Sequence, residues 1–378
     1  MIVSEAMRNL RSGTTRAWTL ALICGVLAAS ALVADALAID AVQRAAARYL
    51  ASGAATLVVE SPGGVDGARC EGMTDVPNVR AAGAMRQTDA PLLPLRTPGI
   101  ELPTFDATPG AVALLRTTGG TDSASQGAPH EGAPREREPH DDTADAGSDG
   151  VFVSAELAET LSLTTGSTLR TGTGAAEVSG VFSYPDDGRT AGLGYSVVLS
   201  VPPRGAFDQC RVLIWPESDA VRAIVASSVL SAGATAESPP TIGQLNPTLG
   251  AHFDADARFR DRPTAFLPLA VIAAAGVAGF VAVRRRRLEL AAARSVGVAL
   301  RAQVAQITLE TLAWSACAAV GALVVSAVGV TVATPSAALD PASALVVALG
   351  TLLAAPTGAA IAVSSVSRTR MHAYFRDR

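Results

Sequence analysis

The 378-residue chain contains no lysine, and arginine supplies all 30 of its basic residues. A Walker A loop needs a lysine to reach the terminal phosphates of a nucleotide, so the chain is not itself a P-loop ATPase. A lysine Schiff base is excluded for the same reason.

Charge and aromatic side chains are both scarce. Charged residues make up 17% of the chain and aromatic residues 4%, whereas 49% is hydrophobic and the mean hydropathy is +0.32. A soluble domain usually carries about 25% charge. The deficit predicts membrane segments.

Only four cysteines and four histidines are present. Cys24 and Cys317 lie inside apolar runs and are expected to act as small hydrophobic residues. Cys70 and Cys210 lie in a long polar region, where we predict a disulfide if that region is outside the cytoplasm; the alternative is two buried free thiols. No Cys-x-x-Cys pair exists and the histidines are scattered, so the sequence predicts no metal centre.

Four apolar runs reach the length of about 20 residues that a bilayer requires. They are predicted to be transmembrane helices, at 17–39, 264–283, 307–333 and 341–366. All are rich in alanine, glycine and valine, which let membrane helices approach closely. A cleaved signal peptide is the alternative for the first run, although its apolar stretch is longer than a usual signal core.

Arginines orient these runs. The segments 1–16, 284–306 and 367–378 together hold 13 arginines and three acidic residues, whereas 40–262 holds 17 arginines and 28 acidic residues. By the positive-inside rule both termini and the 284–306 loop are cytoplasmic, and 40–262 is extracytoplasmic. The sequence therefore predicts a multi-pass protein of the plasma membrane.

The 40–262 region is predicted to be one α+β domain inserted between the first and second transmembrane helices. Strand-like segments alternate with short helical ones. The expected strands lie near 54–60, 78–85, 177–182, 195–201 and 211–215, with a helix near 217–230. The stretch 151–169 is expected to form a strand, a short helix and, after a glycine turn, a second strand.

The segment 117–150 is polar, acidic and rich in glycine, proline and serine. It has too little apolar surface to offset its ordering entropy, so we predict a disordered loop. His130, His140, Asp141 and Asp142 leave weak metal binding open as an alternative, against a solvated loop as the simpler interpretation.

The cytoplasmic loop contains a predicted amphipathic helix at 288–304. Arg287, Arg294 and Arg301 are spaced by seven on one face. The opposite face is a mainly apolar stripe that consists of Leu288, Ala291, Ala292, Ser295, Val296, Ala299 and Leu300. Gly297 is the weak point of this helix, because glycine is a poor helix former. A break there would give two short helices. The arginines either sit near anionic lipid headgroups or form a docking face for an acidic surface of another protein.

The segment from Arg284 to Gly297, R-R-R-R-L-E-L-A-A-A-R-S-V-G, resembles the cytoplasmic segment of MacB/FtsX-like ABC transporter permeases. Glu289, Arg294 and Gly297 match that family's spacing, and Arg301 corresponds to a basic position further on. The start of the chain is similar to the family's amphipathic helix before the first span, here at 1–16. The stretch 151–169 is similar to a segment of its external domain.

This resemblance implies a permease subunit with four membrane helices that forms a homodimer or heterodimer and binds a cytoplasmic ABC ATPase through the 284–306 loop. It implies mechanotransmission to the extracytoplasmic domain, or export of a peptide, antibiotic or lipid-like substrate. Glu289, Arg294, Gly297 and Arg301 are the expected coupling residues. Membrane lipid is the other expected partner, and no nucleic acid is expected.

Three further residues stand out within the predicted spans. Asp35 is expected at a solvated helix end, with a buried functional position as the alternative. Glu310 is expected to pair with an arginine, and Pro356 is expected to kink the fourth helix.

A membrane-anchored sensor or scaffold without ATPase coupling is the alternative function. No Gly-x-Ser-x-Gly or His-Glu-x-x-His motif occurs, so we expect neither an enzyme nor a cofactor.

Overall fold

A computed structural model describes residues 16–88, 92–93, 101–118, 150–171, 174–230, 239–334 and 337–366. The described chain divides into two compact units. One contains residues up to 44 and from 255 onward, and the other contains residues 45–254. The predicted helix at 1–15, the histidines and aspartates of the acidic segment, and the basic tail at 367–378 lie outside the described residues.

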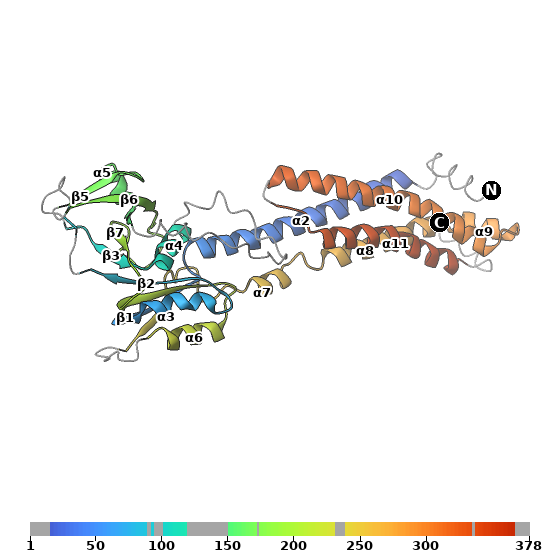
Figure 1. Cartoon of the computed structure of the whole chain (residues 1–378). Coiled ribbons are helices and arrows are strands. Elements are labelled where there is room, and N and C mark those ends of the chain that lie inside the picture. Colours follow the sequence, from blue (N-terminus) through green and yellow to red (C-terminus); the bar gives the residue numbers. More distant parts are fainter. Residues whose placement is uncertain are drawn as a thin grey trace, which may run out of the picture. The chain divides into compact units, whose positions relative to one another are not determined.

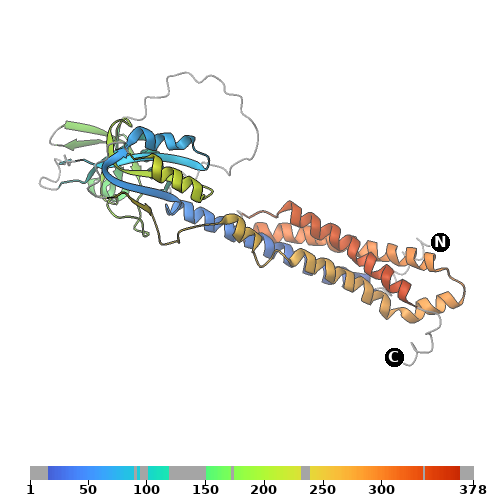
Figure 2. The ribbon, with the colours of Figure 1, turned by 90° about the horizontal axis from the view of Figure 1, so that it is seen from below.

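The first unit is built around four long helices, which Figures 1 and 2 show running alongside one another. All four are long and apolar enough to cross a membrane, as predicted. They are α2 (Ala17–Ala51), α8 (Leu267–Arg285), α10 (Leu300–Ala333) and α11 (Pro341–Ser365). Two short helices complete the unit, α7 (Ala255–Arg260) and α9 (Arg287–Ser295).

Small residues bring these helices together. Ala21 of α2, Ala275 of α8, Ala318 of α10 and Ala355 of α11 are all buried in one cluster. A Cβ added to Gly279 would lie 2.0 Å from the carbonyl oxygen of Ala355, so α8 and α11 touch through backbone. Pro356 lies inside α11, next to this contact.

Helix α2 is longer than the predicted span, because 40–51 is also helical. Asp40 and Arg44 form an i,i+4 ion pair at 2.7 Å, a pairing that supports a helix beyond its apolar part. Asp35 corrects the sequence prediction: it is 2% exposed rather than solvated. It accepts hydrogen bonds from Arg262 Nε at 2.8 Å and from Thr264 Oγ1 at 2.6 Å.

The second unit, the sheet unit, contains a nine-stranded mixed sheet in the order β5-β6-β4-β7-β3-β2-β8-β1-β9. Antiparallel pairs join β1 to β8 and β9 and join β2 to β3 and β8, whereas β3–β7 and β4–β6 are parallel. The strands are β1 (Thr56–Asp66), β2 (Val79–Gln87), β3 (Thr104–Ala107), β4 (Val151–Ser154), β5 (Thr168–Thr171), β6 (Gly174–Phe182), β7 (Val197–Ser200), β8 (Ala206–Ile214) and β9 (Thr241–Gln244).

Helices cover both faces of this sheet. Successive side chains of a strand point to opposite faces, so neighbouring residues of β2 pack beneath different helices. Ala84 of β2 packs in the cluster beneath α6, and its neighbour Met85 packs in the cluster beneath α4. The helices of this unit are α3 (Gly67–Glu71), α4 (Pro109–Thr118), α5 (Ala155–Leu161) and α6 (Asp219–Ser228), with a 3-10 turn at Gly72–Asp75. The prediction of an α+β domain is confirmed.

Candidate functional site

The elbow, defined as residues 284–301, joins α8 to α10 and contains α9. The helix predicted over 288–304 is divided at Gly297, the predicted weak point, because α9 ends at Ser295 and α10 begins at Leu300. Gly297 has φ +102°, a conformation that side chains with a Cβ rarely adopt. Its N–H donates to Arg294 O, and Val298 N–H donates to Ala293 O. This Schellman motif ends α9.

Arg294 is the centre of the elbow and is only 7% exposed. Its Nε donates to Gln303 Oε1 of α10 at 2.7 Å, and its Nη2 donates to the carbonyl oxygen of Val363 at 2.6 Å. Its Nη1 donates to the carbonyl oxygen of Val366, which caps α11. The last carbonyls of a helix lack intrahelical donors and attract cations. One guanidinium therefore joins α9, α10 and the end of α11.

The buried face of α9 differs from the predicted one. Leu290 and Arg294, outside the predicted stripe, are buried, whereas Val296, expected in the stripe, is 86% exposed. Ala291 is buried as its place in the stripe predicts. The prediction assigned arginine to the solvent face by polarity. The carbonyl oxygens of Val363 and Val366, at the end of α11, instead offer acceptors for the five N–H donors of arginine.

A second arginine ties the other end of the elbow. Arg286 Nε donates to Glu289 Oε2 at 2.8 Å, and its Nη1 donates to Glu310 Oε2 of α10 at 2.9 Å. Glu310 is 3% exposed and also accepts a hydrogen bond from Gln306. Its ion pair with Arg286 confirms the prediction that Glu310 pairs with an arginine. Burial lowers the pKa of Arg286, but its hydrogen bond to Glu289 and the charge of Glu310 outweigh this and raise the pKa.

The four residues expected to carry coupling do not share one surface. Arg294 is buried, Gly297 forms a turn, and Glu289 is exposed but paired with Arg286. Arg301 is exposed at the start of α10. Arg286 and Gln303 take part in this network although the sequence did not predict them as partners. The i,i+3,i+4 spacing of 287, 290, 291 and 294 was the signal for the buried face.

One exposed part of the elbow, which we call the apolar tip, consists of three apolar residues, Val296, Val298 and Leu300, and the adjacent Arg301. The three apolar side chains are 86%, 40% and 45% exposed. Apolar side chains exposed together are typical of a contact surface for another protein.

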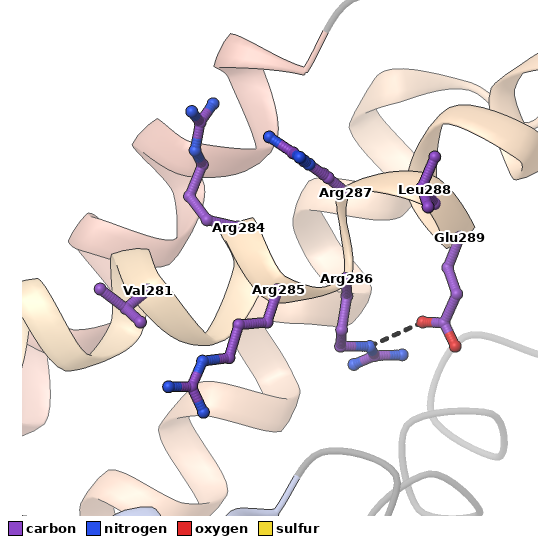
Figure 3. Close-up of a pocket in the computed structure, with 7 residues that line it drawn as sticks. All are labelled: Val281, Arg284, Arg285, Arg286, Arg287, Leu288 and Glu289. Atoms are coloured by element: carbon purple, nitrogen blue, oxygen red, sulfur yellow. Dashed lines mark hydrogen bonds and ion pairs between the residues drawn. The ribbon is translucent and has the colours of Figure 1, made fainter. Parts of the chain in front are cut away.

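A pocket of about 510 Å³ lies at the opposite end of the elbow, where α8 passes into α9 (Figure 3). In this view Arg284 and Arg287 extend to one side of the ribbon, and Arg285 and Arg286 extend to the other. Its lining consists of Val281, Arg284, Arg285, Arg286, Arg287, Leu288 and Glu289.

In the sheet unit, Cys70 of α3 and Cys210 of β8 form a disulfide that closes a sequence separation of 140 residues. Cys24 and Cys317 are free. Across the described residues, no three histidine, cysteine or acidic side chains gather as a metal site.

The comparison with solved structures found 19 chains that match this one. The chain is similar to the crystal structure of the periplasmic region of MacB from Actinobacillus actinomycetemcomitans, with 8% identity and a TM-score of 0.33. The similarity covers 52% of this chain and 91% of that one. No family model and no curated protein matches the chain.

Proposed function

We propose that the chain is the membrane subunit of an ABC transporter of the MacB/FtsX type, which couples ATP hydrolysis by a separate cytoplasmic ATPase to movement of its sheet unit. The observation that carries the proposal is the elbow. Its sequence resembles the family's cytoplasmic segment, and the matching residues Glu289, Arg294 and Gly297 each hold its shape. The chain has no lysine for a P-loop, so the energy comes from a partner.

The distribution of arginine supports the topology of this proposal. The elbow and the segments before α2 and after α11 are rich in arginine, which places them in the cytoplasm by the positive-inside rule. The sheet unit, between α2 and α8 in the chain, is then extracytoplasmic. A disulfide within it suits an oxidising compartment.

Within this proposal, Arg294 positions the elbow and the apolar tip makes the contact. A buried guanidinium with three partners cannot reach a partner protein without breaking its own network. The tip is exposed, and Arg301 beside it supplies a charge for an acidic partner surface. Movement of the tip reaches α10 and α11 through Arg294, and reaches α10 through the Arg286–Glu310 pair.

Substitution of the tip tests this assignment. We expect Leu300→Asp to abolish co-purification of a P-loop ATPase with the tagged, detergent-solubilised chain. An acidic residue is tolerated in the first turn of a helix, so α10 remains folded. Leu249→Asp is the matched control, because Leu249 is 48% exposed in the sheet unit.

The result separates the proposal from its alternative. A wild-type chain that captures no ATPase, under conditions where its membrane insertion is intact, would favour a sensor or scaffold. Equal capture by Leu300→Asp and Leu249→Asp would retain the ATPase but remove the tip from the contact.

A further inference from the structure

Two segments of the chain connect the sheet unit to the helical unit. The first is the end of α2, which runs unbroken from Ala17 to Ala51 and so belongs to both units. The second is the return segment, defined as residues 245–254, which follows β9 and precedes α7. Along the chain, movement of the helices enters the sheet unit through these two segments.

Glu217 binds both segments. It lies between β8 and α6, and its side chain is only 11% exposed. Its Oε1 accepts a hydrogen bond from the Tyr49 hydroxyl of α2 at 2.8 Å, and its Oε2 accepts one from the Phe253 N–H of the return segment at 3.1 Å. Hydrogen bonds to an ionised carboxylate are stronger than those between neutral groups. One carboxylate thus fastens the end of α2 to the return segment.

Aromatic packing makes this junction stiff. Tyr49 is 1% exposed, and its ring centre lies 5.3 Å from that of Phe253 and 6.4 Å from that of Trp215. The rings of Trp215 and Phe253 are 5.9 Å apart. Aromatic pairs at these separations attract each other, and closely packed side chains transmit a displacement instead of absorbing it.

Glu217 also differs from another contact of the α2 end. Arg189 donates from Nη2 to the carbonyl oxygen of Ala51 at 2.8 Å, but Arg189 lies in the loop between β6 and β7. Glu217 follows shortly after Ile214, the last residue of β8, and β8 pairs with both β1 and β2. A displacement of α2 therefore reaches an interior strand of the sheet through Glu217.

We propose that Glu217 is a positioning residue for coupling, which passes movement of α2 to β8 and moves the return segment together with α2. This inference rests on the proposed function, because an ATPase must first move the helices. The elbow receives the movement in the cytoplasm, and Glu217 delivers it to the sheet.

Hydrogen–deuterium exchange of the full-length chain reconstituted with its ATPase tests the proposal. The ATP-dependent change in exchange of β8 is measured in the wild type, in Glu217→Gln and in Tyr49→Phe. Glutamine offers one acceptor oxygen in place of two, and Tyr49→Phe removes only the hydroxyl that reaches Glu217. Each variant should reduce the ATP-dependent change about 5-fold or more, the size of a typical coupling between two sites. Co-purification of the ATPase should stay at the wild-type level, because the elbow is unaltered.

Glu71→Gln is the matched control for stability. Glu71 Oε1 accepts a hydrogen bond from the Gly110 N–H at 2.8 Å, at the start of α4. This variant should lower the melting temperature by an amount similar to Glu217→Gln but keep the ATP-dependent change. Tyr49→Phe keeps the aromatic packing, so it tests the proposal even where Glu217→Gln fails to fold.

Several results would overturn the proposal. A full ATP-dependent change in Tyr49→Phe shows that α2 does not act through Glu217 and leaves the proposed function standing. An equal loss in Glu71→Gln assigns the effect to the stability of the sheet unit. A wild type without any ATP-dependent change removes the proposed function, and this inference with it.

Discussion

Two buried charges, Asp35 and Arg211, lie in contrasting surroundings. Asp35 is matched by Arg262 and Thr264, both in the turn between α7 and α8. Arg211, on β8, donates from Nη2 to Gln209 at 3.1 Å, and its Nε and Nη1 have no hydrogen-bond partner among the described residues. Removal of the partner of a paired buried charge destabilises the fold, whereas an unpaired buried charge destabilises the fold by its presence.

Loss of the Asp35 partner should destabilise the helical unit. Arg262→Gln leaves a buried carboxylate without its cation, and we expect the melting temperature of the purified chain to fall by roughly 5 °C or more. Arg69→Gln is the control, because the Arg69–Asp66 pair is exposed and 3.8 Å long. Equal melting temperatures for Arg262→Gln and wild type, measured by intrinsic fluorescence, would contradict this role.

Removal of Arg211 should have the opposite effect. Burial lowers the pKa of Arg211, and the neighbouring Tyr184 hydroxyl offsets this only in part. A folded-state pKa below the unfolded value means that the protonated arginine destabilises the fold at neutral pH. Arg211→Met should raise the melting temperature by about 3 °C, since an apolar side chain of similar volume replaces the charge. Arg170→Met, at an exposed position, should not, and a decrease for Arg211→Met would show that its charge is needed.

At the scale of elements, the elbow depends on the turn at Gly297. Nothing lies within 4 Å of an added Cβ, so an alanine there meets only backbone strain of about 1–2 kcal/mol. We expect Gly297→Ala to favour fusion of α9 with α10, which turns the tip away. ATPase activity stimulated by the chain should then fall about 10-fold, a loss of about 1.4 kcal/mol in coupling.

The control for that variant is Gly205→Ala. Gly205 has φ +94° and equally open surroundings in the sheet unit. Both variants should lose similar thermal stability, but only Gly297→Ala should lose stimulation. Equal stimulation of the ATPase by the two variants would show that the turn is not needed for coupling.

Long elements were predictable from the sequence, and short or polar ones were not. Apolar length alone identified the four helices, and alternation identified most strands of the sheet. In the helix expected near 217–230, Val221, Val225 and Val229 are buried, but Ile224 is 45% exposed. Strand β3, of four residues, and helix α4 were missed because each is short and its partners are distant in the chain.

The elbow shows why the rest was not predictable. Helical periodicity allows two faces of α9 to be the buried one, and residue polarity favoured the face without Arg294. The correct face contains Arg294, whose burial depends on carbonyls of α11 about 70 residues further along. Asp35 was misplaced for the same reason, since its partner Arg262 lies 227 residues away.

At the scale of the whole molecule, the disulfide reports on the compartment of the sheet unit. Alkylation of the denatured, unreduced protein should modify two thiols, those of Cys24 and Cys317, and reduction should expose two more. Mass spectrometry counts the adducts. Four adducts without reductant would mean that Cys70 and Cys210 are not bonded in the cell and would contradict the extracytoplasmic assignment.

We propose that ATP hydrolysis in the cytoplasm changes the conformation of the sheet unit and that the elbow transmits this change. Hydrogen–deuterium exchange of the chain reconstituted with its ATPase tests this most directly. ATP should alter exchange in the sheet strands of the wild type. Arg294→Gln should bind the ATPase yet lose that response, whereas identical exchange with and without ATP in the wild type would contradict the account.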